Sequence, residues 1–266
     1  MPPADRTELA LRPLLNTEAI RSPAFGNNGS QTGAIVEPVT NIVILTESSI
    51  EKKLVQSLMA DNNVVHVRYQ ALMVTYQGAD GEMHTHIVDI VATLQDGTKI
   101  GYVVKPETAA LKHDTRGLTE TMSRHVSPSQ VSRLQLVTSR QLPEWGNRNA
   151  RQLLNARRDR RNDADALLRD MAPELTKPIR IGDLTARLGG GHLAFRPVLR
   201  AIYFGTLTYL GIGIIDENGK VKFSGQVMPD TDLSIAPPPA SQEEPPVILR
   251  RKKTPKPKKR ASYRSV

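Results

Sequence analysis

Three residues between positions 48 and 106 have the types and the spacing to bind a divalent cation beside a phosphate. Glu51 lies near the start of a predicted helix, Asp89 lies in a predicted strand, and Lys105 ends the next strand. Mg²⁺ prefers oxygen ligands, a bound metal lowers the pKa of its water, and a nearby lysine orients that water. The order of these residues predicts a nuclease-type centre, with Glu51 and Asp89 as ligands of Mg²⁺ or Mn²⁺ and Lys105 beside the phosphate.

Local patterns predict the elements that position these residues. Ser48 opens an amphipathic run with apolar residues at helical spacing, and the run stops at residues 61–63. Extended segments are predicted at residues 64–69, 71–76, 84–94, 99–104 and 133–138, with turns at 78–81 and 95–98 and a helix after Pro106. Because the turn at 95–98 folds two strands together, it brings Asp89 and Lys105 to one place.

Each of the three residues also has an ordinary structural explanation. Ser48 and Glu51 have the spacing of a capping box, in which the serine caps a helix and the glutamate bonds back to the backbone. Lys105, before a proline, also fits an ordinary lysine at a strand end. Asp89 is harder to explain in this way, because it interrupts the apolar run 87–91 and an unpaired buried carboxylate is costly. We therefore expect Asp89 to have a partner.

Taken together, these residues resemble the N-terminal catalytic domain of TnsA-type endonucleases, the subunits that cut one DNA strand at the ends of certain cut-and-paste transposons. The family's Ser-x-x-Glu helix start, its Tyr-Thr-Pro-Asp-like step and its Glu/Gln-x-Lys-Pro motif correspond to residues 48–51, 85–89 and 103–106. The resemblance covers residues 46–140 and extends to the region beyond, since the family carries a helical DNA-binding domain there. It implies a restriction-endonuclease-like fold, metal-dependent DNA cleavage and protein partners of a transposition-type complex.

Two positions depart from that family pattern. Val103 stands where the family has an acidic or amide residue, and Val88 stands where a proline usually precedes the aspartate. Loss of one ligand from a small set of oxygens weakens metal binding unless Glu107, Glu47 or a backbone carbonyl replaces it. The sequence thus leaves two functions open: a DNA endonuclease subunit of a transposition or mobile-element system, or a catalytically inactive DNA-binding or assembly scaffold that keeps the nuclease fold.

The predicted fold class is α/β, a restriction-endonuclease-like mixed sheet flanked by helices and followed by a winged-helix-like domain with a small hairpin. A short helix at 181–188, a glycine break, a longer helix at 194–210 and a hairpin formed by 211–215 and 220–223 give the second outline. The predicted organisation is a flexible arm at 1–40, the nuclease-like domain at 41–145, a charged connecting helix at 146–173, the winged-helix-like domain at 174–228, and a proline-rich spacer with a basic tail at 229–266.

Basic residues predict contacts with double-stranded DNA. Arg196 and Arg200 lie one turn apart on the predicted recognition helix. The net charge of +9 comes mostly from the tail, where basic residues suit phosphate contacts that weaken as salt rises. The tail residues concerned are Arg250, Arg251, Lys252, Lys253, Lys256, Lys258, Lys259 and Arg260.

Composition excludes several other classes of site. The chain has no cysteine, so disulfides, thiolate zinc sites and cysteine nucleophiles are excluded. His84 and His86 share one side of a strand, but no third nitrogen or sulfur ligand follows, so we interpret them as surface histidines. No apolar run approaches the length of a membrane span, and the N-terminus lacks a signal-peptide pattern. We expect no membrane contact and a cytoplasmic, nucleoid-associated location.

Overall fold

A computed structural model describes residues 14–15, 19–20, 32–38, 40, 42–158 and 162–227 of the chain. The proline-rich spacer and the basic tail predicted at 229–266 lie outside the described residues, as does most of the predicted arm at 1–40. In the described part the fold is mixed α/β, with a mixed four-stranded sheet flanked by helices, as predicted. No helix in that part combines the length and apolar character needed to cross a membrane.

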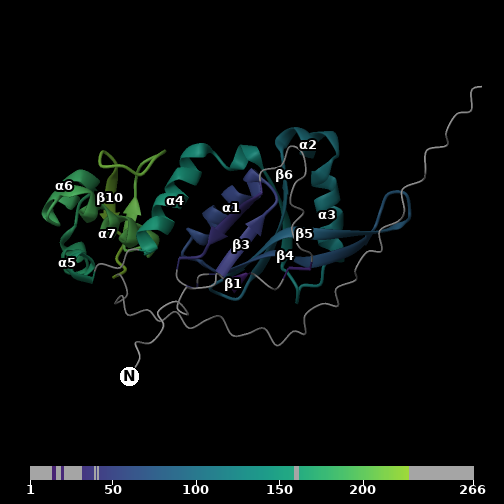
Figure 1. Cartoon of the computed structure of the whole chain (residues 1–266), viewed down its shortest axis with the longest axis horizontal. Coiled ribbons are helices and arrows are strands. Elements are labelled where there is room, and N and C mark those ends of the chain that lie inside the picture. Colours follow the sequence, from purple (N-terminus) through teal and green to yellow (C-terminus); the bar gives the residue numbers. More distant parts are fainter. Residues whose placement is uncertain are drawn as a thin grey trace, which may run out of the picture.

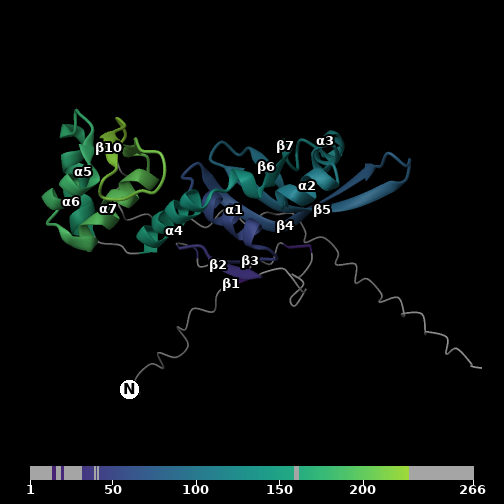
Figure 2. The ribbon, with the colours of Figure 1, turned by 90° about the horizontal axis from the view of Figure 1, so that it is seen from above.

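The four-stranded sheet has the order β4-β5-β6-β7 and lies at the centre of the larger lobe in Figure 1. Its strands are β4 (Val64–Gln77), β5 (Met83–Leu94), β6 (Lys99–Lys105) and β7 (Arg133–Thr138). The first three form antiparallel hairpins, and β7 lies parallel to β6 after a helical crossover. The far end of the β4–β5 hairpin projects beyond the helices, as both Figure 1 and Figure 2 show.

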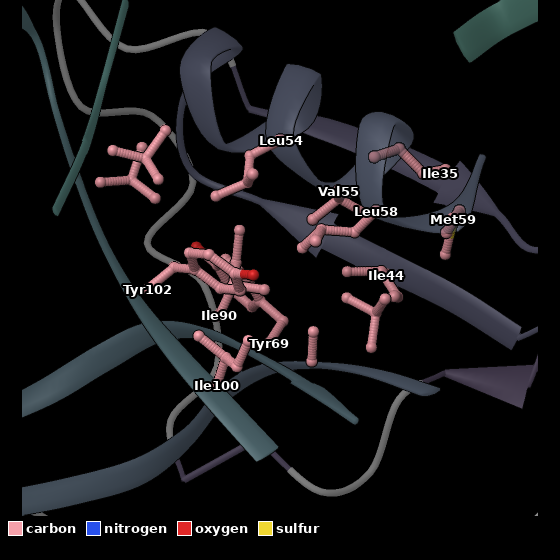
Figure 3. Close-up of a cluster of buried hydrophobic side chains, with 14 of the residues drawn as sticks. Ile35, Ile44, Leu54, Val55, Leu58, Met59, Tyr69, Ile90, Ile100 and Tyr102 are labelled. Atoms are coloured by element: carbon pink, nitrogen blue, oxygen red, sulfur yellow. The ribbon is translucent and has the colours of Figure 1, made fainter. Parts of the chain in front are cut away.

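Helix α1 (Ser49–Met59) covers one face of this sheet. Ser48 caps it by accepting the Glu51 backbone N–H at 3.2 Å, as the capping-box spacing predicts. Its apolar stripe buries Leu54, Val55 and Leu58 against the strands. Figure 3 shows these side chains pointing from the helix toward Tyr69 of β4 and the neighbouring strands. The first core therefore lies between α1 and the sheet.

The crossover between β6 and β7 covers the other face. It consists of α2 (Glu107–Lys112) and α3 (Thr115–His125). Met122 of α3 is fully buried in a second apolar cluster with Val88 of β5 and Val103 of β6. Alternate residues of one strand thus serve two cores: Val103 packs on the α3 side, whereas Val104 packs on the α1 side.

A second small sheet, of order β1-β3-β2, corrects the predicted N-terminal arm. Its strands are β1 (Leu14–Leu15), β2 (Gly33–Val36) and β3 (Ile42–Thr46). Ile35 of β2 faces Ile44 of β3 in the antiparallel ladder, and both side chains are buried in the first core. The prediction of a flexible arm up to residue 40 is wrong for residues 33–36, because Ile35 supplies enough apolar contact to dock this segment.

The charged connecting helix predicted at 146–173 overlaps α4 (Glu144–Arg158) and α5 (Asn162–Met171), and residues 159–161 lie outside the described residues. Helix α4 is not a solvated connector, because Leu154 is buried in the first core and Ala156 in a third core near the C-terminus. It runs between the two lobes of the molecule (Figure 2). The sequence did not indicate that α4 packs into both cores, because its few apolar residues are separated by many arginines.

Arg157 of α4 joins the two lobes. Its guanidinium forms an ion pair with Glu37 at 2.9 Å and donates to the Met59 carbonyl at the end of α1 at 3.1 Å. It also lies 4.3 Å from the centre of the Tyr203 ring, the geometry of a cation–π contact. One side chain therefore contacts the N-terminal strands, helix α1 and the C-terminal lobe.

The C-terminal lobe has a three-stranded sheet of order β8-β10-β9 and packs α5, α6 and α7 around the third core. Its elements are β8 (Ile179–Arg180), α6 (Ile181–Arg187), α7 (Gly191–Tyr203), β9 (Leu207–Tyr209) and β10 (Lys220–Phe223). The predicted helix at 194–210 ends early because Gly205 adopts a positive φ of 75°. Residues 207–209 rather than 211–215 therefore pair with β10.

Candidate functional site

The strands β5 and β6 part at Asp89. The pairs between β5 and β6 extend from Thr93 with Lys99 to Ile90 with Tyr102. Beyond Ile90 and Tyr102, β5 stays paired with β4 only, and β6 stays paired with β7 only. Asp89 comes directly after the last pair, and its Oδ2 accepts the backbone N–H of Val104 at 2.7 Å. The carboxylate thus satisfies a donor at the opening between the strands, which we call the β5–β6 fork. Asp89 therefore has a partner, as expected, and that partner is a backbone amide.

A β-bulge lies opposite Asp89 on the other neighbouring strand. Tyr69 of β4 pairs with Ile90 and Leu72 pairs with Val88, so Gln70 and Ala71 together face Asp89. Gln70 has a φ of 48°, a left-handed conformation that costs a non-glycine residue free energy. Bulges of this kind bend a strand and frequently lie next to functional sites. The bulge appears in the sequence only as the gap between the segments predicted at 64–69 and 71–76.

Glu51 lies on the α1 side of the fork, but its carboxylate is already engaged. Oε2 accepts the Glu47 backbone N–H at 2.8 Å and the Tyr69 hydroxyl at 2.9 Å. The capping-box explanation applies in part, because Glu51 accepts the N–H of Glu47 just before the cap residue Ser48, and Glu51 also belongs to a buried polar cluster. Only 7% of Glu51 is exposed.

Tyr69 is the centre of that polar cluster, and sequence reasoning did not select it. Its hydroxyl donates to Glu51 and accepts from the Glu47 backbone N–H at 3.1 Å and from the Gln70 side-chain amide at 3.1 Å. Burial and the Glu51 carboxylate raise the pKa of Tyr69 well above its usual value, so the hydroxyl stays protonated. The alternation of β4 marks Tyr69 only as a core residue.

Charges on three segments act on Asp89. Burial raises the pKa of Asp89 to about 6, while the Val104 N–H and then Lys105 act to lower it, and Glu51 and Glu47 add to the rise. Glu51, at a helix start, and Lys105, on the neighbouring strand, therefore both lie within electrostatic reach of Asp89.

The donor set does not complete a magnesium site. Within the described residues, no three His, Cys, Asp or Glu side chains gather closely enough to hold a metal ion. Val103, at the position where the resembled family has an acid or an amide, is 0% exposed and packs in the α3-side core. Asp89 and Glu51 each use one oxygen on a protein N–H or O–H donor. The residues present at the fork do not fit the implied Mg²⁺ or Mn²⁺, which needs several oxygen ligands.

The two histidines lie on the projecting β4–β5 hairpin, where they pair with Tyr76 and Val74 rather than with residues of the fork. The exposed His84 lies 2.9 Å from the Asp80 carboxylate in the turn and stacks on Tyr76. His86 pairs with Val74 across the hairpin and is half-buried. His84 therefore has a structural partner within the turn.

The predicted DNA contact of Arg200 is wrong, because Arg200 is buried. Its Nη2 lies 2.8 Å from Oδ1 of Asp165 on α5, its Nη1 donates to the Ala156 carbonyl of α4 at 2.8 Å, and only 3% of Arg200 is exposed. Arg196 is half-buried. Every described side chain of α7 from Leu193 to Tyr203 is buried or half-buried, because α4, α5 and α6 surround this helix.

No protein-family model matches this chain, and a search of curated proteins finds no significant match.

Proposed function

We propose that this protein is a DNA-binding subunit derived from a nuclease, in which the altered centre serves as a structural scaffold rather than as a metal-dependent catalyst. The observation that carries this proposal is the burial of Val103 in an apolar core at the position of the missing ligand. The commitment of Glu51 to the Glu47 N–H and the Tyr69 hydroxyl supports it further. Val103 thus contributes to packing at the fork, and Glu51 contributes to hydrogen bonding there.

DNA binding is supported by where the charge lies. Residues 42–140 contain ten Lys or Arg and ten Asp or Glu, whereas residues 144–158 and 162–227 contain 12 basic and eight acidic residues. The tail at 250–260 adds eight basic residues and no acid. Positive charge is thus concentrated after the sheet, where it favours contact with phosphates.

The order of elements in the C-terminal lobe also supports this reading. The chain runs α5, β8, α6, α7, β9, β10, which is the helix, strand, helix, helix, hairpin order of a winged helix. Together with the resemblance to TnsA-type endonucleases, this order favours a role in a transposition-type complex with double-stranded DNA and protein partners.

A second candidate function is metal-dependent DNA strand cleavage, and one observation favours it. Lys105 and Glu51 both act on the charge of Asp89 at the fork, so the three residues of the predicted centre share one neighbourhood. For this candidate the ligand missing at position 103 has to come from another group.

Two binding measurements on the full chain test the scaffold proposal. Calorimetric titration with Mg²⁺ is expected to give no heat of specific binding, while fluorescence anisotropy with duplex DNA is expected to show binding that weakens as salt rises. Deleting residues 249–266 should make the slope of log affinity against log salt less steep. Specific Mg²⁺ binding that Asp89→Ala abolishes would favour the second candidate, and absence of salt-sensitive DNA binding would contradict both.

A further inference from the structure

The outer face of the C-terminal sheet carries three exposed basic side chains. Arg180 of β8 pairs directly with Lys220 of β10, and Lys222 lies two residues further along β10, beside Thr208 of β9. All four of these residues are exposed, and Arg180, Lys220 and Lys222 define what we call the basic sheet face. Their neighbours Val221 and Leu207 turn inward and are buried in the third core.

Strand geometry fixes the side on which these charges lie. Side chains two apart on a strand point to the same face and are separated by about 6–7 Å, and neighbouring strands lie about 5 Å apart. Lys220, Lys222 and Arg180 therefore project from a small, rigid area on one side of the sheet. Along one DNA strand, charges recur about every 3.4 Å of helix axis, so the separation of Lys220 and Lys222 corresponds to about two phosphate steps.

Acidic side chains stand at the edge of this face. Asp216 and Glu217 lie in the turn that leads into β10. The Asp216 carboxylate accepts the backbone N–H groups of Asn218 and Gly219, at 2.9 Å and 3.1 Å, so it is turned into its own loop. Arg180 is held by Asn218, whose side-chain oxygen lies 3.4 Å from its guanidinium. Because the Asn218 side chain is neutral, this contact does not offset the positive charge of Arg180.

The helix that the sequence selects for DNA contact does not offer such a surface. Helix α7 is covered by α4, α5 and α6, and its Arg200 is committed to Asp165. We propose that this protein contacts the phosphate backbone of double-stranded DNA through the basic sheet face, with Arg180, Lys220 and Lys222 as the contact residues. The proposal deepens the DNA-binding function proposed above and rests on it.

The test compares two triple variants of the full chain. The first carries Arg180→Gln, Lys220→Gln and Lys222→Gln. The control carries Lys112→Gln, Arg116→Gln and Arg124→Gln, which removes three exposed charges from α2 and α3 and changes the net charge equally. Affinity for a 30-base-pair duplex is measured by fluorescence anisotropy from 50 to 300 mM salt, and circular dichroism checks folding.

The sheet variant is expected to bind DNA about 10- to 100-fold more weakly near 100 mM salt, with the slope of log affinity against log salt reduced by about two to three. The control variant is expected to bind like the wild type. Equal weakening of both variants, or of neither, would overturn the basic sheet face while leaving DNA binding itself intact. Absence of salt-sensitive binding by the wild type would instead overturn the proposed function.

A basic face also attracts anionic lipid. Vesicles that contain phosphatidylserine therefore serve as a second probe in co-sedimentation. If the sheet variant loses vesicle binding while its DNA affinity matches that of the wild type, the face belongs to a membrane contact and the DNA assignment is overturned.

Discussion

Val104 donates its backbone N–H to the Asp89 carboxylate over 2.7 Å, so a side chain replaces a strand partner where β5 and β6 separate. The bulge at Gln70 on β4 lies directly opposite Asp89. This relationship explains why an acid is tolerated in the apolar run 87–91: it satisfies an amide that the opening between the strands would otherwise leave without an acceptor.

The ionised form of Asp89 costs folding free energy, and Asp89→Asn should remove that cost. Because the folded-state pKa is raised to about 6, the native protein holds this proton more tightly than the unfolded chain, and the stability from this group falls as pH rises from about 4 to about 6. At pH 7 the variant should be more stable by about 1–3 kcal/mol, since asparagine still accepts the Val104 N–H.

Urea unfolding at several pH values between 4 and 8 checks this prediction. The difference between variant and wild type should be small at pH 4 and should grow up to about pH 6–7. A variant that is less stable than the wild type at pH 7 would show that the ionised carboxylate is favoured at the fork.

The Tyr69 hydroxyl should be a significant source of stability. Tyr69→Phe removes a donor to Glu51 and leaves the Glu47 N–H and the Gln70 amide with one acceptor fewer, and loss of buried hydrogen bonds of this kind costs about 1–3 kcal/mol. Tyr102→Phe is the matched control, because Tyr102 lies in the same core and its hydroxyl takes no part in this cluster. Thermal unfolding of both variants decides, and equal shifts in Tm would refute a special role for Tyr69.

The ion pair between Arg200 and Asp165 should be essential for the C-terminal lobe. Arg200→Met removes the guanidinium that lies 2.8 Å from the fully buried Asp165 carboxylate, and breaking a buried pair in this way costs about 3–5 kcal/mol. Combining it with Asp165→Leu should recover most of that loss, since both charges are then gone. Arg187→Met, at an exposed position of α6, serves as the control. Chemical unfolding tests all three, and a single variant as stable as its control would contradict the pairing.

Local patterns predicted the elements around the fork well. Ser48 caps α1, and β7 coincides with the strand predicted at 133–138, because both depend on capping chemistry and alternation that a short window contains. Arg200 shows what such a window lacks. The apolar stripe of α7 marked one face for the core, but the packing of α4 and α5 on the remaining surface depends on residues 35–44 positions away in the chain.

The sequence selected only part of the candidate site. Asp89, Glu51 and Lys105 were selected from spacing, and the pairing of β5 with β6 explains why Lys105 lies within electrostatic reach of Asp89. Tyr69 and the turn of Gln70 into a left-handed conformation were not selected, because their roles depend on the register between β4 and β5. The basic sheet face was missed for a related reason: the alternation of Lys220, Val221 and Lys222 gains meaning only when β8 brings Arg180 beside it.

We propose that the β5–β6 fork is a structural element rather than a working metal centre. Incubation of the full-length protein with supercoiled plasmid and either Mg²⁺ or Mn²⁺, beside Asp89→Ala purified in the same way, tests it most directly. We predict that both proteins leave the same background level of nicked circles. Nicking by the wild type that requires the metal and disappears in Asp89→Ala would contradict the claim and establish strand cleavage.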